Sequence, residues 1–351
     1  MKIFVIGGTG FIGPFVVRKL YEKGHDVTVF HRGKTEGDLP SEVTHLYDPS
    51  LNLGDRQCLE SHRDELKRLA PDVVLDMIPV IEQDAKTVMQ VFDGIARRVV
   101  AISSQDVYRG YGKLIGIESG PIDAVPLSED APLREKLYPY RSEDGRAEDD
   151  PRRWMDHYEK ILIERVYTSE PALPGTVLRL PMVYGPGDKQ HRLFEYLKRM
   201  DDNRPVIILS SGMAKWRWTR GYVGNVAEAI ACAVLDERSA GRIYNAGEKE
   251  TGTMAGWVKE IGDFAGWPGK VCEVPEISLP DSLQAGFNTD QHLVASTDRI
   301  RDELGYQETV SREDGLKRTI EWERENPPRK IDPAQFDYAA EDAFLAEWRS
   351  G

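Results

Sequence analysis

A glycine-rich turn follows a short apolar run at the very start of the chain. Residues 2–6 are KIFVI, and residues 7–13 are GGTGFIG. A short apolar run that ends at glycine is typical of a buried strand in a parallel sheet. The spacing of Phe15, Val16 and Leu20 predicts that a helix follows the turn. The chain therefore begins with a strand, a glycine turn and a helix.

The glycines of this turn have separate physical roles. Gly7 permits the tight turn, Gly10 lets the backbone approach a pyrophosphate, and Gly13 allows the helix to pack against the sheet. The helix N-terminus supplies free N–H groups and a partial positive charge for phosphates. We predict a dinucleotide site that includes Gly7, Thr9, Gly10, Phe11, Ile12 and Gly13.

Strand-like and helix-like segments alternate over the first hundred residues, which predicts an α/β fold with a Rossmann-type, doubly wound parallel sheet. Residues 108–153 are rich in glycine, proline and charge, and we interpret them as a long loop over the mouth of a site. The predicted strands are 2–6, 26–30, 43–47, 73–75, 98–103 and 175–180. The predicted helices include 11–23, 58–69, 81–92, 154–168 and 223–235.

The chain length favours a large α/β domain with a smaller accessory lobe. We predict that residues 1–180 form the dinucleotide-binding Rossmann domain, to which 215–250 return. Residues 181–214 and 251–325 are predicted to form a C-terminal substrate-binding lobe. Residues 326–351 are predicted to be a C-terminal tail.

Composition argues against several classes of function. The net charge of −13 is the opposite of the basic footprint of a nucleic-acid-binding protein. No apolar run is long enough to span a membrane, and the N-terminus is not a secretion signal, so we expect a cytoplasmic protein. The three cysteines are far apart, which argues against disulfides and a metal site.

The spacing of the glycines, Gly-x-x-Gly-x-x-Gly, resembles the extended short-chain dehydrogenase/reductase family, which contains nucleotide-sugar epimerases and dehydratases. The resemblance covers roughly residues 1–265. The other segments that carry it are GDR at 54–56, SSQDVY at 103–108, LRLPMVYGPG at 178–187, VGNVAEAI at 223–230 and YNAG at 244–247. The resemblance implies an NAD(P)-dependent oxidoreductase or epimerase that transfers a hydride on a nucleotide sugar or related polyol. It also implies a homodimer.

The resemblance assigns further cofactor contacts. Asp55 matches the aspartate that contacts adenine, although Asp48 competes for that role. The tip of the second strand carries no carboxylate for the ribose hydroxyls, and Arg32 there suits a 2′-phosphate. We therefore predict NADP, with NAD left open if Arg32 only stacks on adenine. The remaining predicted cofactor contacts are Ser103, Lys160 and Pro181.

The catalytic pattern departs from the family. Its members carry Tyr-x-x-x-Lys, one helical turn apart, but the residue four before Lys160 is Asp156. Tyr158 is two residues before Lys160, about 200° around a regular helix, and is predicted to point away from it. Ser104 is expected near the reacting carbon, and Lys160 on the nicotinamide ribose.

The proton carrier is left open by the sequence. Asp156 is either a base or only an ion-pair partner of Lys160, because a carboxyl beside a cation is a poor proton donor at neutral pH. Asp106 is a second catalytic candidate. The tyrosines near the predicted mouth are Tyr108, Tyr140 and Tyr184.

The substrate contacts follow from the resemblance. Gln105 stands where dehydratases carry a carboxylate, which weakens a dehydratase interpretation. Arg217 and Arg220 straddle the place of an arginine that binds the substrate diphosphate, with a hairpin edge as the alternative. Tyr184 completes the predicted substrate set, and Lys189 and His191-Arg192 could line the same cleft.

A second hypothesis concerns a protein that binds the dinucleotide without catalysis. Around the glycine loop and Arg32 the chain also resembles the chloroplast stem-loop RNA-binding proteins, which are atypical relatives. A regulatory or interaction module is therefore the alternative function, although the net charge of −13 argues against RNA as its partner.

Overall fold

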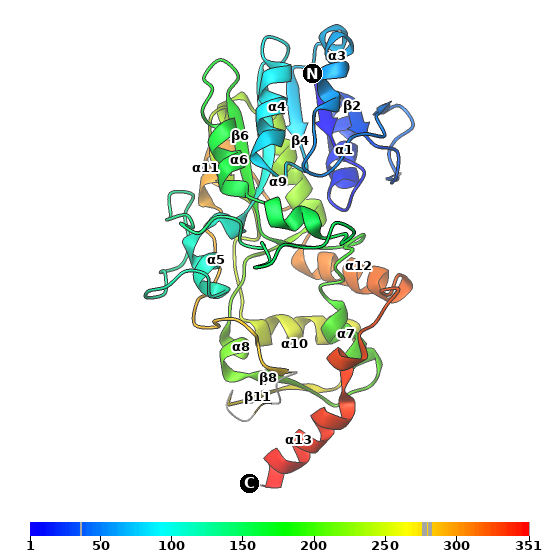
Figure 1. Cartoon of the computed structure of the whole chain (residues 1–351). Coiled ribbons are helices and arrows are strands. Elements are labelled where there is room, and N and C mark those ends of the chain that lie inside the picture. The colour runs from blue at the N-terminus through cyan, green and yellow to red at the C-terminus, as the bar shows by residue number, and fades with distance from the viewer. Residues whose placement is uncertain (36, 276–278, 280–282, 351) are drawn as a thin grey trace.

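The computed structural model describes residues 1–35, 37–275, 279 and 283–350. Within these residues, seven parallel strands form the central sheet, in the order β10-β6-β5-β4-β1-β2-β3 (Figure 1). This confirms the predicted Rossmann-type sheet. The strands are β1 (Lys2–Ile6), β2 (Asp26–His31), β3 (Thr44–Tyr47), β4 (Val73–Asp76), β5 (Arg98–Ser104), β6 (Gly175–Leu180) and β10 (Ile243–Asn245).

The strand order reverses at β1. The chain moves outward from β1 through β2 and β3, and then returns to β4 on the other side. Ile6 at the end of β1 pairs with Phe30 on one side and with Asp76 on the other. Parallel sheets bind ligands outside the carboxyl ends of their strands at such a reversal. The fold therefore creates a crevice beside the glycine turn.

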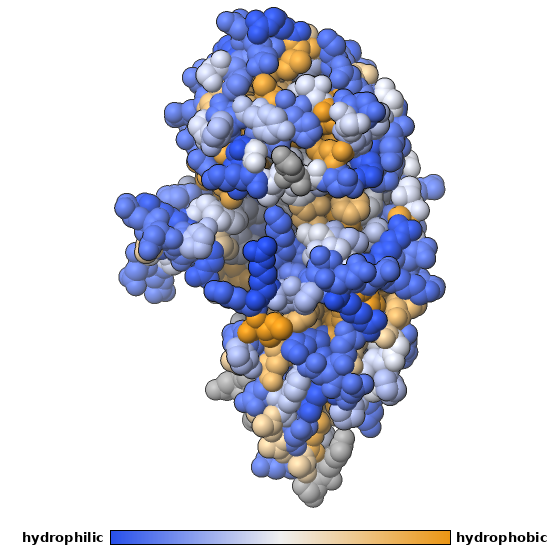
Figure 2. Space-filling model, turned by 90° about the vertical axis from the view of Figure 1, so that its right-hand side faces the viewer, coloured by the Kyte–Doolittle hydropathy of each residue, from blue (hydrophilic) through white to orange (hydrophobic). Residues whose placement is uncertain are grey.

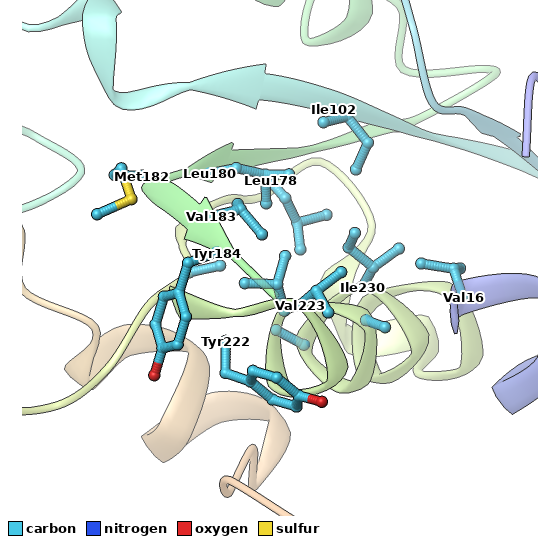
Figure 3. Packing of buried hydrophobic residues seen from close by; sticks show 14 of the residues in the cluster. Val16, Ile102, Leu178, Leu180, Met182, Val183, Tyr184, Tyr222, Val223 and Ile230 are labelled. Atoms are coloured by element: carbon cyan, nitrogen blue, oxygen red, sulfur yellow. The ribbon is translucent and has the colours of Figure 1, made fainter. Parts of the chain in front are cut away.

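Helices cover both faces of the sheet. On one face, α1 (Gly13–Glu22) and α9 (Val223–Leu235) contact each other, and Figure 3 shows Val16 and Ile230 beside Ile102 of β5. On the other face, α4 (Glu82–Phe92) packs beside α6 (Lys160–Tyr167). Further helices of this half are α2 (Cys58–Ser61), α3 (Arg63–Leu69), α5 (Arg109–Leu114) and α11 (Asp298–Leu304), with short 3-10 turns at Gln105–Val107, Arg153–His157 and Glu237–Ser239.

A smaller lobe lies below the carboxyl ends of the strands in Figure 1. Its two-stranded parallel sheet pairs β8 (Val206–Ser210) with β11 (Lys270–Val274). A second parallel pair, β7 (Met182–Tyr184) and β9 (Arg220–Tyr222), directly follows β6 and precedes α9. The helices of the lobe are α7 (Phe194–Asp201), α8 (Ser211–Lys215), α10 (Met254–Ala265), α12 (Arg312–Glu325) and α13 (Tyr338–Ser350), and a 3-10 turn covers Pro333–Phe336.

The predicted C-terminal tail is part of this lobe. Leu345 of α13 is buried in a cluster with Val206 and Ile208 of β8. Glu341 of the same helix pairs with the buried guanidinium of Arg199 on α7, at 2.8 Å. The last helix therefore closes the lobe core rather than extending away from it.

The predicted helix over 154–168 is wrong in its first half. Residues 153–157 form a 3-10 turn, Tyr158 and Glu159 are extended, and α6 begins at Lys160. The Glu159 carboxylate accepts a hydrogen bond from the backbone N–H of Ile161, at 2.9 Å, and so caps the new helix. The predicted loop over 108–153 also contains a short helix, α5.

None of the described helices is both long and apolar enough to cross a membrane.

Candidate active site

The first cavity lies at the glycine turn and has a volume of about 200 Å³. It opens at the carboxyl ends of β1 and β2, where the strand order predicts a ligand crevice. Its lining includes Gly7, Gly8, Thr9, Gly10, His31, Arg32, Thr35, Leu51, Asn52, Leu53, Ile78 and Lys189.

The backbone of the turn matches the roles expected of its glycines. Gly7 and Gly8 have φ angles of +92° and +89°, which disfavour any residue with a side chain. A Cβ on Gly13 would lie 2.4 Å from the carbonyl carbon of Gly8, so this glycine lets α1 meet the turn. A Cβ on Gly10 would meet nothing within 4 Å, which leaves the space over Gly10 for a ligand.

The electrostatics of this cavity suit an anion. Among its described lining residues, the only charged side chains are the cations Arg32 and Lys189. No side chain caps the N-terminus of α1, so its first N–H groups also face the turn. The cavity therefore fits the phosphates of a dinucleotide.

The predicted adenine contact is not part of this lining. Asp55 is exposed, and its carboxylate accepts a hydrogen bond from the backbone N–H of Gln57 at 3.0 Å. Its competitor Asp48 binds the ring of His62 at 2.9 Å. Leu51 and Asn52, from the loop between these two aspartates, line the cavity instead.

The second cavity lies beyond the carboxyl end of β5 and has a volume of about 510 Å³. Five of its fifteen lining residues are aromatic. On the face seen in Figure 2, hydrophobic side chains reach the surface between the two lobes. Its lining is Ser104, Gln105, Asp106, Tyr111, Tyr140, Trp154, Met155, Tyr158, Leu180, Pro181, Met182, Gln190, Arg192, Trp218 and Leu293.

A buried carboxylate with two phenols forms the polar centre of this cavity. Tyr158 and Tyr140 each donate a hydrogen bond to Oδ2 of Asp106, at 2.9 Å. The hydroxyl of Tyr111 lies 2.9 Å from that of Tyr140 and extends the chain of phenols. Burial raises the pKa of Asp106, and the nearby Arg134 and the two phenols only partly offset this effect.

Lys160 lies at the inner edge of this group. Its Nζ donates hydrogen bonds to the carbonyl oxygens of Pro79 and Ile102, and it lies 5.5 Å from the centre of the Tyr158 ring. Burial lowers the pKa of Lys160 to about 8, although attraction to Asp106 raises it in part. The side chain of Ser104 is a hydrogen-bond partner of Tyr158, so Ser104, Tyr158 and Lys160 form one group.

Two sequence predictions about this group are wrong. Tyr158 does not point away from Lys160, because its backbone is extended and the 100° step of a helix does not apply. Asp156 is not a partner of Lys160. Its buried carboxylate binds the guanidinium of Arg146 and accepts from two backbone N–H groups, those of Arg146 and Ser142. These bonds hold the pKa of Asp156 at about 2.

Other predicted contacts are divided between the cavity and the core. Gln105 and Pro181 line the cavity of Ser104. Ser103 is buried, and its hydroxyl donates to Glu164 rather than facing a ligand. Tyr108 is also buried, with its hydroxyl on the side-chain oxygen of Asn245 at 2.7 Å.

The residues predicted to hold a substrate diphosphate do not reach this cavity. Arg220 is 2 % exposed and lies over the ring of Trp257, at 4.4 Å from the ring centre. Arg217 lines a separate hollow beside Lys249. Tyr184 is fully buried between the lobes, as Figure 3 shows beside Tyr222, and donates to Glu248 at 2.8 Å.

Part of the aromatic wall was not expected from the sequence. Tyr111 and Trp154 were not predicted as site residues, and Tyr158 was predicted to point away. The one available signal was the density of aromatic residues between 108 and 158, on both sides of the predicted mouth.

The sequence of this chain matches a known family. The sequence model of the NAD dependent epimerase/dehydratase family matches residues 3–247. The chain belongs to this family. The match spans the whole central sheet and includes both cavities' main elements, from the glycine turn to β10.

Curated relatives and solved structures are distant but cover most of the chain. UDP-N-acetyl-alpha-D-glucosaminuronate decarboxylase of Bacillus cytotoxicus is 24% identical over 92% of this chain and 98% of its own length. Chloroplast stem-loop binding protein of 41 kDa b from Arabidopsis thaliana is 24% identical, over 90% of this chain and 77% of its own length. The UDP-glucose 4-epimerase of Thermotoga maritima, solved with UDP-glucose, has a TM-score of 0.64 at 21% identity, and the alignment covers 93% of this chain and 99% of that one.

Proposed function

We propose that this protein is an NAD(P)-dependent oxidoreductase or epimerase that acts by hydride transfer on a nucleotide sugar or related polyol. The observation that carries the proposal is the group formed by Ser104, Tyr158 and Lys160, beside a cavity suited to a dinucleotide. The names of the relatives support the substrate class, since one acts on a UDP-sugar and a structural neighbour was solved with UDP-glucose.

The cofactor supplies the hydride acceptor or donor when it is bound, and the chain's own groups handle the proton. We assign Tyr158 to the proton step that the family's tyrosine performs. Its phenol oxygen receives the proton of the substrate hydroxyl while its own proton passes to Oδ2 of Asp106, 2.9 Å away. The raised pKa of Asp106 suits a carboxylate that must accept this proton.

The neighbouring groups position this step. The hydroxyl of Ser104 orients the reacting oxygen, and the cation of Lys160 favours negative charge developing on Tyr158. Burial raises the pKa of Tyr158 well above its ordinary value, so the phenol is a neutral donor at rest. Reduction runs the same relay backwards, from Asp106 through Tyr158 to the substrate oxygen.

We propose NADP as the preferred cofactor and a homodimer as the assembly. Arg32 lines the dinucleotide cavity and has no carboxylate partner among the described residues, so its charge is available to a 2′-phosphate. The homodimer is expected from the family alone. Light scattering on the purified protein tests it.

The test of function is absorbance at the nicotinamide band. The protein is mixed with NADP⁺ or NAD⁺ and a panel of nucleotide sugars, and product masses are measured in parallel. Reduction of the cofactor, or an isomerised sugar without net reduction, is the expected result. Tight cofactor binding with no turnover on any sugar would favour the second candidate, a binding protein without catalysis, to which the chloroplast stem-loop binding relative lends support.

A further inference from the structure

The segment between β7 and α7 contributes to both cavities. Lys189 lines the dinucleotide cavity, whereas Gln190 and Arg192 line the cavity of Ser104. Successive residues of one short segment, residues 188–192, thus face two different ligand spaces. The segment follows β7 directly, where the chain leaves the Rossmann half for the smaller lobe.

The 188–192 segment is held rigidly from within. Asp188 is 2 % exposed, and its carboxylate accepts from the backbone N–H of Gln190 at 3.0 Å and from the guanidinium of Arg192 at 2.7 Å. The same guanidinium donates to the carbonyl oxygen of Val183 at 3.0 Å. The charge of Arg192 is therefore compensated inside the segment.

A second anchor comes from the smaller lobe. His191 has a φ angle of +50°, a strained value for a residue with a side chain. Its Nδ1 lies 2.7 Å from Oε2 of the buried Glu323 on α12, and its ring stacks on Trp322 at 5.6 Å between ring centres. These contacts offset the strain and fix the directions of the residues on either side.

Lys189 differs from Arg192 in its charge environment. Lys189 forms no ion pair with a carboxylate among the described residues, in a chain of net charge −13. Gly187, two residues before it, packs beside the ring of Phe11, with 3.5 Å between the ring and a Cβ built on the glycine. This contact sets the segment against the start of α1, where the glycine turn is suited to a pyrophosphate.

We propose that Lys189 binds the pyrophosphate of the dinucleotide. This inference rests on the proposed function. Lys189 would then contact a phosphate from the same segment whose Gln190 and Arg192 line the cavity of Ser104.

The test compares Lys189→Met with the wild-type protein. Dissociation constants for NADP⁺ and for NAD⁺ are measured by calorimetry at low and high salt. We expect about tenfold weaker binding of both dinucleotides and a smaller salt dependence, because one charge-assisted contact with the phosphates is lost. Lys259→Met is the matched control, since Lys259 pairs with Asp263 on the outer face of α10 and makes the same change in net charge.

Each outcome separates this inference from the proposed function. Unchanged affinity in Lys189→Met overturns the inference, and so does a loss confined to NADP⁺, which would place the lysine at the 2′-phosphate. If Lys189→Met binds both dinucleotides more weakly and the wild-type protein turns over no sugar, the inference is upheld and the proposed function is overturned. A wild-type chain that binds neither dinucleotide overturns both.

Discussion

At the scale of single residues, the proposed mechanism depends on Tyr158. Its phenol reaches Asp106 and the vicinity of Lys160 from an extended stretch of chain, not from a helix. The side chain of Glu159 holds this part of the chain in its extended conformation. Its carboxylate is fully buried, contacts the guanidinium of Arg134 at 3.1 Å and caps α6 through the backbone N–H of Ile161.

Replacing Tyr158 by phenylalanine removes one hydroxyl and keeps the ring in the aromatic wall. We expect kcat to fall by about a hundredfold or more, the usual contribution of a positioned acid or base. The dissociation constant of the cofactor should change little, because the glycine turn is untouched. Tyr111→Phe is the control, since its hydroxyl contacts Tyr140 and not Asp106. Equal losses in both variants would contradict the assigned role.

The contacts of Asp156 with Arg146 and Ser142 suit a structural residue, and we expect its replacement to affect stability. In Asp156→Asn the charge opposite Arg146 is lost, and one of the two accepting oxygens becomes an NH2 group that faces an N–H donor. We expect turnover to persist and the free energy of unfolding to fall at neutral pH. Turnover that disappears while the protein stays folded would restore Asp156 as the base.

The pH dependence of stability provides a second check on Asp156. Its folded-state pKa of about 2 lies below its ordinary value of 3.8, so its stabilising contribution is present above pH 4. That contribution is lost as the pH falls from about 4 to about 2. Urea unfolding at a series of pH values should show a fall over this window in the wild type that is smaller in Asp156→Asn.

At the scale of elements, two glycines of the turn should affect different properties: Gly13 the stability of the fold, and Gly10 the binding of the cofactor. Gly13→Ala would force a Cβ against the backbone of Gly8, whereas Gly10→Ala places its methyl group in open space. We expect Gly10→Ala to unfold like the wild type in urea but to bind the dinucleotide at least tenfold more weakly, because the methyl group occupies the path of the pyrophosphate. Gly13→Ala should lower the free energy of unfolding instead. Normal cofactor binding by Gly10→Ala would contradict the placement of the phosphates.

The elements that the sequence predicted well are those set by local pattern. The strands β1, β2 and β5 and the helices α4 and α9 follow from apolar spacing between glycine, proline and charged residues, and their predicted ends differ from the structure by a residue or two. The break before α6 could not be predicted, because it depends on the contact of Glu159 with Arg134, far away in the sequence. The burial of Arg220 on Trp257 has the same origin.

At the scale of the whole molecule, the two cavities and the core of the smaller lobe are formed by different parts of the chain. The glycine turn and the end of β2 form most of the first cavity, whereas Arg192 and Trp218 reach the cavity of Ser104 from the segments before α7 and after α8. The core of the smaller lobe lies far from the glycine turn and depends on α13. Stability of this core and affinity for the cofactor should therefore vary independently.

Two neighbouring residues of α13 test this independence. Glu341→Gln leaves the buried Arg199 without its charged partner, and such a loss costs about 3 kcal/mol of unfolding free energy. Asp342→Asn removes an exposed partner of Arg204 on the same turn and should cost less than about 1 kcal/mol. Urea unfolding followed by tryptophan fluorescence measures both. The dissociation constant of the dinucleotide should stay at its wild-type value in each variant. A loss of affinity in Glu341→Gln would mean that the core of the smaller lobe and the dinucleotide site are coupled.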